Sequence, residues 1–544
     1  MTRNVARLLI ALRRLRRRLQ RVDVLRVWLC AVIIGVVAAY GVIAFRFMID
    51  QVSQFSFGET EAGIVSAAAE LNPFRSWAAP VIGGLVVSGL LYLAERFGWL
   101  PGGRGQAVAD VIEARAVAGG HISLRAGVAA AIVSAVSLGA GASAGREGPA
   151  VHLGATIASI INRKLGFTAK QRRALLGCGA AAAVSASFNA PVAGVLFALE
   201  VILGNYALSV FGPIAAASVA AAIITRIHLG NFPAFAPPDY GAVATIDVAL
   251  AAILGILCGL IASGFLLSTE KMTVSLREFA QKKNISYLLL PPIGGAAVGV
   301  IGVFFPEVFG VGYEAVTRAL NGEYAIHLLV VLVLMKCAAT AVTLSCRFGG
   351  GVFSPGLVIG AFAGAAFGAT LAHFFPGATA SPVYYAMIGM GAASGAILGA
   401  PISTTLIVFE LTGEYGITIS LMVAVAIATL ITQWACGQSF FHWQLSRRGY
   451  DLSEGPQGII LKTTRVREVM EKMPPGAPLP ADAERLETHH SLGEALAKLN
   501  DAEEHGLPVV DSTEKDQVVG YLSRVKALAA YNKALIDENI EHHT

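Results

Sequence analysis

One acidic residue, Glu147, stands next to Arg146 in the glycine- and proline-containing stretch Gly145-Arg146-Glu147-Gly148-Pro149, within otherwise apolar sequence. Glycine before a helix lets other groups approach the backbone closely, and proline in the first turn leaves no N–H group unpaired. The amides at such a helix start attract an anion without a full positive charge. Because Glu147 has the same sign as that anion, we expect its carboxylate to occupy the anion's place when ionised and to leave it when protonated.

The same template recurs about two hundred residues later, as Gly351-Val352-Phe353-Ser354-Pro355. A Gly-Ala pair follows at identical spacing in both copies. Further along, each copy has an Ala-Pro step with a glutamate nine residues after the proline, Glu200 in the first and Glu410 in the second. Repeated halves with interrupted apolar segments predict two helix starts that meet near the middle of a membrane.

A structural role for Glu147 is the alternative, as the ion-pair partner of Arg146 or Arg173. A carboxylate at membrane depth is costly and is therefore by default a functional group. We accordingly favour a role in anion binding.

Composition indicates a membrane protein. Hydrophobic residues make up 55% of the chain and charged residues 14%, with a mean hydropathy of +0.64, whereas soluble domains have roughly 25% charged residues. Since about 20 apolar residues cross a bilayer, the shorter Gly/Pro-rich pieces are predicted to be re-entrant or half-helices. The long apolar runs are 27–45, 79–93, 126–138, 246–267, 327–342 and 417–434.

The N-terminal segment, residues 1–24, is strongly basic. Residues 1–26 contain nine arginines and one acid, Asp23. Basic residues next to a membrane span favour the cytoplasmic side, so we expect a membrane-surface segment that binds lipid rather than nucleic acid. The apolar run that follows is too long for a cleavable signal.

The composition becomes charged and mixed after about residue 461. A helical pattern over 491–499, a strand over 506–511, a second strand over 517–522 and a helix near 526–535 predict a small α/β unit outside the membrane.

Other chemical classes fit the sequence poorly. The six cysteines are scattered singly, and no Cys or His spacing suggests a metal site. The stretch 141–145 matches a G-x-S-x-G nucleophile elbow at Ser143, but it lacks the strand and triad that an intramembrane hydrolase needs. A cation transporter would favour carboxylates or carbonyls over amides. We expect no catalytic residues.

Together, the two Gly-x-x-x-Pro stretches and the Ala-Pro segments ending at Glu200 and Glu410 closely resemble the CLC family of chloride channels and chloride/proton antiporters, over residues 25–449. The resemblance implies an all-α polytopic homodimer with one pore per subunit, each built of two inverted-topology repeats with broken half-helices. It implies that Glu147 is the gate, flanked by Arg146 and Gly148, and that the amides of Val352 and Phe353 hold the anion. Residues 462–540 resemble a single CBS motif, which implies pairing across the dimer.

Three positions depart from the family pattern. At the third anion-coordinating stretch, Gln106 stands where a serine or histidine is usual, and the pore tyrosine falls at Phe441. At the inner proton-carrying glutamate of the antiporters stands Val201, which cannot ionise. These departures predict passive, channel-like flow, with a proton-coupled chloride or fluoride antiporter as the alternative.

The remaining expectations concern partners and place. We expect a homodimer in contact with lipid and with chloride or other small anions, in a bacterial inner membrane, with both termini cytoplasmic. No cofactor is expected, and the CBS motif gives no specific signature for an adenine nucleotide.

Overall fold

The computed structural model describes residues 3–100, 107–231, 235, 237–241, 243–450, 458, 461–462, 464–472, 484–502, 505–511 and 518–543, with backbone only for 3–23, 534 and 536–543. Gln106 therefore lies outside the described residues, as do the side chains of the arginine-rich start. The chain divides into two compact units, Met1–Tyr206 with Val210–Phe441, and Ala207–Ser209 with His442–Thr544. Each unit is described separately below.

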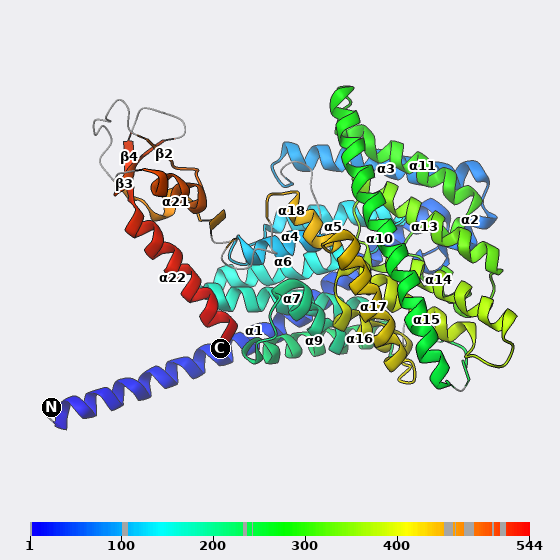
Figure 1. The fold of residues 1–544 in the computed structure, drawn as a ribbon, viewed down its shortest axis with the longest axis horizontal. Coiled ribbons are helices and arrows are strands. Elements are labelled where there is room, and N and C mark those ends of the chain that lie inside the picture. Colours follow the sequence, from blue (N-terminus) through cyan, green and yellow to red (C-terminus); the bar gives the residue numbers. More distant parts are fainter. Residues whose placement is uncertain are drawn as a thin grey trace. The chain divides into compact units, whose positions relative to one another are not determined.

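The first unit is a bundle of helices of very different lengths (Figure 1). Among the described residues, eight helices are long and apolar enough to cross a membrane, as the composition predicted. The chain order is α1 (Arg3–Phe57), α2 (Ile64–Glu70), α3 (Pro73–Arg96), α4 (Ala107–Ala116), α5 (Leu124–Gly139), α6 (Glu147–Leu165), α7 (Ala169–Phe188), α8 (Pro191–Phe197), a π-helical turn (Ala198–Leu203), α9 (Leu208–Leu229), α10 (Thr245–Lys282), α11 (Leu290–Phe304), α12 (Tyr313–Leu320), α13 (Ile326–Ser345), α14 (Phe353–Phe374), α15 (Pro382–Leu398), α16 (Pro401–Thr412), α17 (Thr418–Cys436) and α18 (Phe440–Ser446).

Short helices are interspersed among long ones, and the helix lengths correct the expectations in two places. The run 126–138 lies in α5, whose 16 residues extend about 24 Å at 1.5 Å per residue, less than the hydrocarbon thickness of about 30 Å. By contrast, α14 has 22 residues and is long enough to cross, although its interrupted start suggested a half-helix. The short α8 and α16 have 7 and 12 residues.

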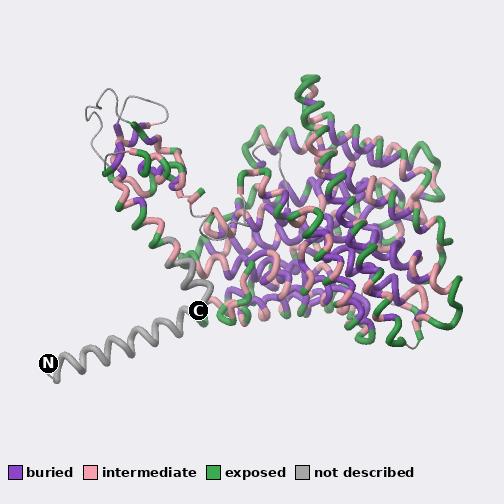
Figure 2. Tube along the Cα trace, in the orientation of Figure 1, coloured by how far each residue is buried: buried purple, intermediate pink, exposed green. Residues whose placement is uncertain are grey.

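Glycines of the repeated motifs allow very close helix crossings. A Cβ added at Gly154 of α6 would lie 2.3 Å from the carbonyl oxygen of Gly179 in α7, and one at Gly360 of α14 would lie 2.0 Å from that of Gly389 in α15. Each repeat therefore closes its own helix pair through backbone contact, as small residues do in membranes. Figure 2 shows the buried residues concentrated inside this unit.

Replacing Gly360 by alanine should destabilise the first unit. The added methyl group would overlap a backbone carbonyl that cannot move aside cheaply, and such overpacking costs roughly 1–3 kcal/mol. We expect a lower melting temperature in detergent for Gly360→Ala. The matched control is Gly264→Ala in α10, where a Cβ meets nothing within 4 Å; equal melting temperatures for both variants would contradict the close crossing.

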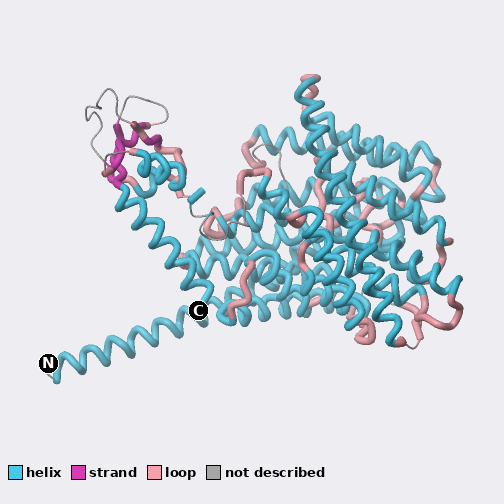
Figure 3. The backbone as a smooth tube through the Cα atoms, in the orientation of Figure 1, coloured by secondary structure: helices cyan, strands magenta, loops and turns pink. Residues whose placement is uncertain are grey.

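The strands among the described residues all belong to the second unit (Figure 3). Here β1 (Glu471–Lys472), β2 (Leu486–Glu487), β3 (Gly506–Val510) and β4 (Val518–Ser523) form a sheet in the order β1-β4-β3-β2. β2 and β3 are parallel, and the other pairs are antiparallel. The described part of this unit also contains the helices α20 (Val466–Val469), α21 (Leu492–Asp501) and α22 (Arg524–His543).

Local sequence explains the start of α21. The Ser491 hydroxyl accepts a hydrogen bond from the Glu494 N–H, while the Ser491 N–H donates to the Glu494 carboxylate at 2.7 Å. These bonds form a capping box and hold the pKa of Glu494 below its usual value. Leu492, Leu499 and Leu507 belong to the apolar core that α21 and the sheet share.

Candidate functional site

The two interrupted stretches meet at their glycines. Gly145 and Gly351 form an antiparallel bridge in which each N–H donates to the other's carbonyl oxygen at 2.7 Å. A Cβ at Gly351 would lie 3.2 Å from the Gly148 nitrogen, and a Cβ at Gly145 would lie 3.1 Å from the Ser354 nitrogen. Glycine therefore favours the close meeting of the starts of α6 and α14, which lie more than 200 residues apart in sequence.

Both helix starts carry amides ahead of the intrahelical hydrogen bonds. The first bonds of α6 and α14 are donated by Ala150 to the Arg146 carbonyl and by Gly356 to the Val352 carbonyl, at 3.1 and 3.0 Å. Neither N-cap, Arg146 or Val352, accepts a hydrogen bond through its side chain. Two uncapped helix starts facing one place favour negative charge there. Gly148, Val352 and Phe353 lie at these two helix starts.

The side chain of Glu147 spans from one helix start to the other. Its Oε1 accepts hydrogen bonds from the Ser354 hydroxyl at 2.5 Å and from the Tyr313 hydroxyl at 3.3 Å. Its Oε2 has no hydrogen-bond partner within the described residues, and the residue is 4% exposed. The carboxylate of α6 is thus held at the amino end of α14.

Arg146 pairs with Glu61 rather than with its neighbour Glu147. Its Nη1 lies 2.6 Å from Glu61 Oε2, and both side chains are buried. The guanidinium also lies 4.8 Å from the centre of the Tyr313 ring. The alternative in which Glu147 serves only as the ion-pair partner of Arg146 is therefore not what the structure shows, since Arg146 pairs with Glu61.

The sequence did not predict that Tyr313 and Glu61 belong to the site, because their partners Glu147 and Arg146 are far away in the chain. Tyr313 opens α12 after Gly312, whose φ of +92° suits glycine. Lys336, completely buried in α13, donates to the carbonyls of Val308 and Gly310 at 2.9 and 3.1 Å and so fixes the loop that leads to Tyr313. Ser354, in contrast, had a visible signal, because it is the repeat counterpart of Gly148.

Of the other predicted site positions, Val201 and Phe441 lie on elements other than α6 and α14. Ala107, which follows Gln106, borders Gly148, since a Cβ at Gly148 would lie 3.3 Å from the Ala107 Cβ. Phe441 is buried beside Phe440 in α18, 6.0 Å between ring centres. Val201 is half-buried in the π-helical turn that ends the α8 segment.

The repeated glutamates cap each other's repeat. Glu200 accepts the N–H groups of Ile402 and Ser403 at the start of α16, at 3.1 and 2.7 Å. Glu410 accepts those of Val192 and Ala193 at the start of α8, also at 3.1 and 2.7 Å. This reciprocal geometry explains why both glutamates follow their prolines by the same number of residues.

The nucleophile-elbow alternative is wrong. Ser143 lies between helices α5 and α6 and not after a strand, and it is completely buried. Its hydroxyl is 3.1 Å from that of Thr340, and its N–H donates to Thr343. These contacts fix the loop before Gly145 and make Ser143 structural.

Comparisons with known proteins agree with this architecture. Residues 83–433 match the family described as voltage gated chloride channel. A putative chloride channel protein, ClcB-like, from Ralstonia nicotianae is 32% identical over 74% of this chain and 93% of its own length. The voltage-gated ClC-type chloride channel ClcB of Escherichia coli is 32% identical over 74% of this chain and 95% of its own. The solved structure of a slow cyanobacterial Cl⁻/H⁺ antiporter has a TM-score of 0.69 at 23% identity, covering 78% of this chain and 98% of that one.

Fold and site together define a multi-pass membrane protein that carries anions. The chain belongs to the CLC family of voltage-gated chloride channels, and its activity is CLC-type chloride transport rather than enzymatic catalysis.

Proposed function

We propose that Glu147 is the gate of one anion pathway per subunit, and that the anion binds where the starts of α6 and α14 meet. The observation that carries this proposal is the Glu147 carboxylate accepting the Ser354 hydroxyl at the amino end of α14. An anion between the helix starts would compete with the carboxylate for the same donors. Protonation or rotation of Glu147 would release them.

Gly148, Val352 and Phe353 would supply amides to this anion, with Arg146 behind the first helix start. Gln106 lies outside the described residues, so the proposal that its amide replaces the usual hydroxyl rests on its place in the sequence alone. Phe441 would leave the inner mouth without a hydroxyl donor. The experiment is anion efflux from liposomes with purified protein, comparing chloride, nitrate and fluoride under an imposed proton gradient; no chloride efflux would contradict the proposal.

The proposal includes passive flow. A proton relay from the inner solution needs a titratable side chain at Val201, which is apolar, and the neighbouring Glu200 already accepts two amide hydrogen bonds from α16.

The second candidate is proton-coupled exchange of chloride or fluoride. It is favoured by the enclosed Glu147 carboxylate, whose free Oε2 has no partner among the described residues and could take up a proton.

We propose that the protein is a homodimer. The hydrogen bonds that cap α8 and α16 reach the surface of the first unit at Val192 and Ile402, which are 54% and 47% exposed. Lipid cannot satisfy polar groups, so a protein surface should cover this face. A second copy, related by twofold symmetry, would cover its own matching face.

The second unit would be a single CBS motif, paired with that of the other subunit in the cytoplasm. The arginine-rich start of residues 1–24 would lie on the same side, in a bacterial inner membrane. We propose no bound cofactor for this unit; a regulatory adenine nucleotide is the alternative, and equilibrium binding of adenosine triphosphate to the full-length protein tests it.

Removing residues 462–544 should leave the dimer and its chloride permeation intact. The helices α8 and α16, which we propose lie at the dimer interface, belong to the first unit. The second unit has about 80 residues and buries too little surface to hold two large subunits together. Light scattering on the truncated protein in detergent, beside the full-length protein, should give equal subunit numbers. Monomers would contradict this account.

A further inference from the structure

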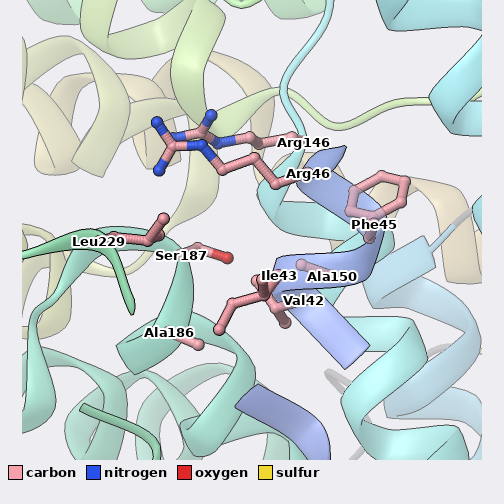
Figure 4. Close-up of a pocket in the computed structure, with 9 residues that line it drawn as sticks. All are labelled: Val42, Ile43, Phe45, Arg46, Arg146, Ala150, Ala186, Ser187 and Leu229. Atoms are coloured by element: carbon pink, nitrogen blue, oxygen red, sulfur yellow. The ribbon is translucent and has the colours of Figure 1, made fainter. Parts of the chain in front are cut away.

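A small pocket lies beside the candidate site, among α1, α6, α7 and α9 of the first unit (Figure 4). Three of its lining residues are polar: Arg46 of α1, Arg146 at the start of α6 and Ser187 near the end of α7. The other six are apolar, including Phe45, Ala150 and Leu229. The space has room for little more than one water-sized ligand.

Two polar groups of this pocket, the Ser187 hydroxyl and the Arg46 guanidinium, have no hydrogen-bond acceptor among the described residues, whereas Arg146 is paired with Glu61. The Ser187 hydroxyl is buried and has no hydrogen-bond partner in the described chain, and Figure 4 shows it directed into the pocket. The half-buried Arg46 forms no hydrogen bond or close ion pair within the described residues. Its guanidinium lies on the same side of the pocket as that of Arg146. The two like charges repel each other, and Glu61, the carboxylate that attracts both, is ion-paired with Arg146.

The nearby carboxylates are partly engaged elsewhere, although Glu61 Oε1 has no hydrogen-bond partner among the described residues. Glu61 Oε2 pairs with Arg146 at 2.6 Å, and Asp50, one turn along α1 from Arg46, accepts the Glu61 N–H at 3.1 Å. At the rim, Arg226 donates to Asn189 at 2.8 Å, and His228 packs against Tyr40. These rim groups add positive charge or none. Because Glu61 and Asp50 direct their hydrogen bonds elsewhere, an anion from solution would supply the acceptor that the Ser187 hydroxyl and Arg46 do not have among the described residues.

We infer that this pocket binds a small monovalent anion, of halide size, between the guanidinium of Arg46, that of Arg146 and the hydroxyl of Ser187. The site is separate from the place between α6 and α14, because the pocket is lined by the second turn of α6 at Ala150 and by α7 and α9. Arg146 borders both places. An anion in the pocket would thus contact Arg146, the neighbour of Glu147 in sequence. It could pass from there into the anion pathway, although the pocket itself is not part of that pathway.

The test is bromide, located by anomalous scattering in crystals of the full-length protein. Wild type should show bromide in the pocket, Arg46→Gln should lose it, and Ser187→Ala should weaken it. From the strength of charged and neutral hydrogen bonds, we expect affinity losses of about tenfold and roughly threefold. The control is Arg226→Gln, which removes a charge from the same region but not from the pocket.

Two outcomes would overturn the inference. One is bromide between α6 and α14 of wild type with none in the pocket; the other is undiminished pocket bromide in Ser187→Ala and Arg46→Gln together. Ser187→Ala is a small change that should fold even if Arg46→Gln does not. Bromide between the helix starts reports separately on the proposed central site, so failure of one site is distinguishable from failure of the other.

Discussion

Glu147→Ala should raise chloride flux at neutral pH and remove most of its dependence on pH. The ionised carboxylate now accepts the Ser354 and Tyr313 hydroxyls at the place where the anion would bind. A hydrogen bond to a charged group contributes ~1.5–3 kcal/mol, so its loss frees the site by roughly 10- to 100-fold. Glu147→Gln should act in the same direction, because the amide resembles the protonated acid. Chloride efflux from liposomes between pH 4.5 and 7.5 (about the range over which carboxyls and histidines titrate) measures both.

The matched control is Glu59→Gln, which neutralises an exposed carboxylate elsewhere in the first unit. It should keep the pH dependence of wild type. Ser354→Ala offers a sharper comparison, since it keeps the Glu147 charge but removes the closest donor to it, and it should weaken the closed state in part. Wild-type pH dependence in both well-folded Glu147 variants would mean that this residue is structural.

Glu200→Gln should destabilise the protein strongly and leave ion coupling unchanged. Its carboxylate accepts two amide N–H groups at the start of α16, and an amide side chain can replace at most part of that interaction. From the strength of charge-assisted bonds, we expect a loss of about 2–4 kcal/mol, measured as a lower melting temperature in detergent.

Glu410→Gln is the natural control, because Glu410 makes the same two bonds to α8 from the other repeat. The two variants should lose similar stability. If Glu200→Gln changed the reversal potential under a pH gradient while Glu410→Gln did not, Glu200 would be a proton relay and the proposal of passive flow would fail.

The duplicated motifs made much of the first unit predictable. Identical spacing of glycine and proline predicted that two helix starts meet, and the bridge between Gly145 and Gly351 is that meeting. Apolar runs located most spans, because a span needs about 20 apolar residues whatever surrounds it. The helix of 491–499 and the strands of 506–511 and 517–522 appear as α21, β3 and β4, with residue 517 outside the described range.

Other features depend on contacts that no local pattern records. Tyr313 reaches Glu147 across 166 residues, and Glu61 reaches Arg146 across 85. The partners of Glu200 and Glu410 were equally hidden, although their common spacing was visible. The strands β1 and β2 have two residues each and exist only through pairing with β4 and β3. The sequence thus pointed to Glu147 but not to the Tyr313 hydroxyl that donates to it.

The reversal potential in planar bilayers, measured with opposed chloride and pH gradients, tests most directly whether this CLC protein conducts passively. We propose that Val201 occupies the position of the antiporters' inner glutamate and that Glu200, which caps α16, does not replace it, so that the described residues offer no side-chain relay to Glu147. We predict a reversal potential fixed at the chloride Nernst value at every pH gradient. A potential that shifts with the pH gradient in a constant ratio would contradict passive flow and identify a proton-coupled exchanger.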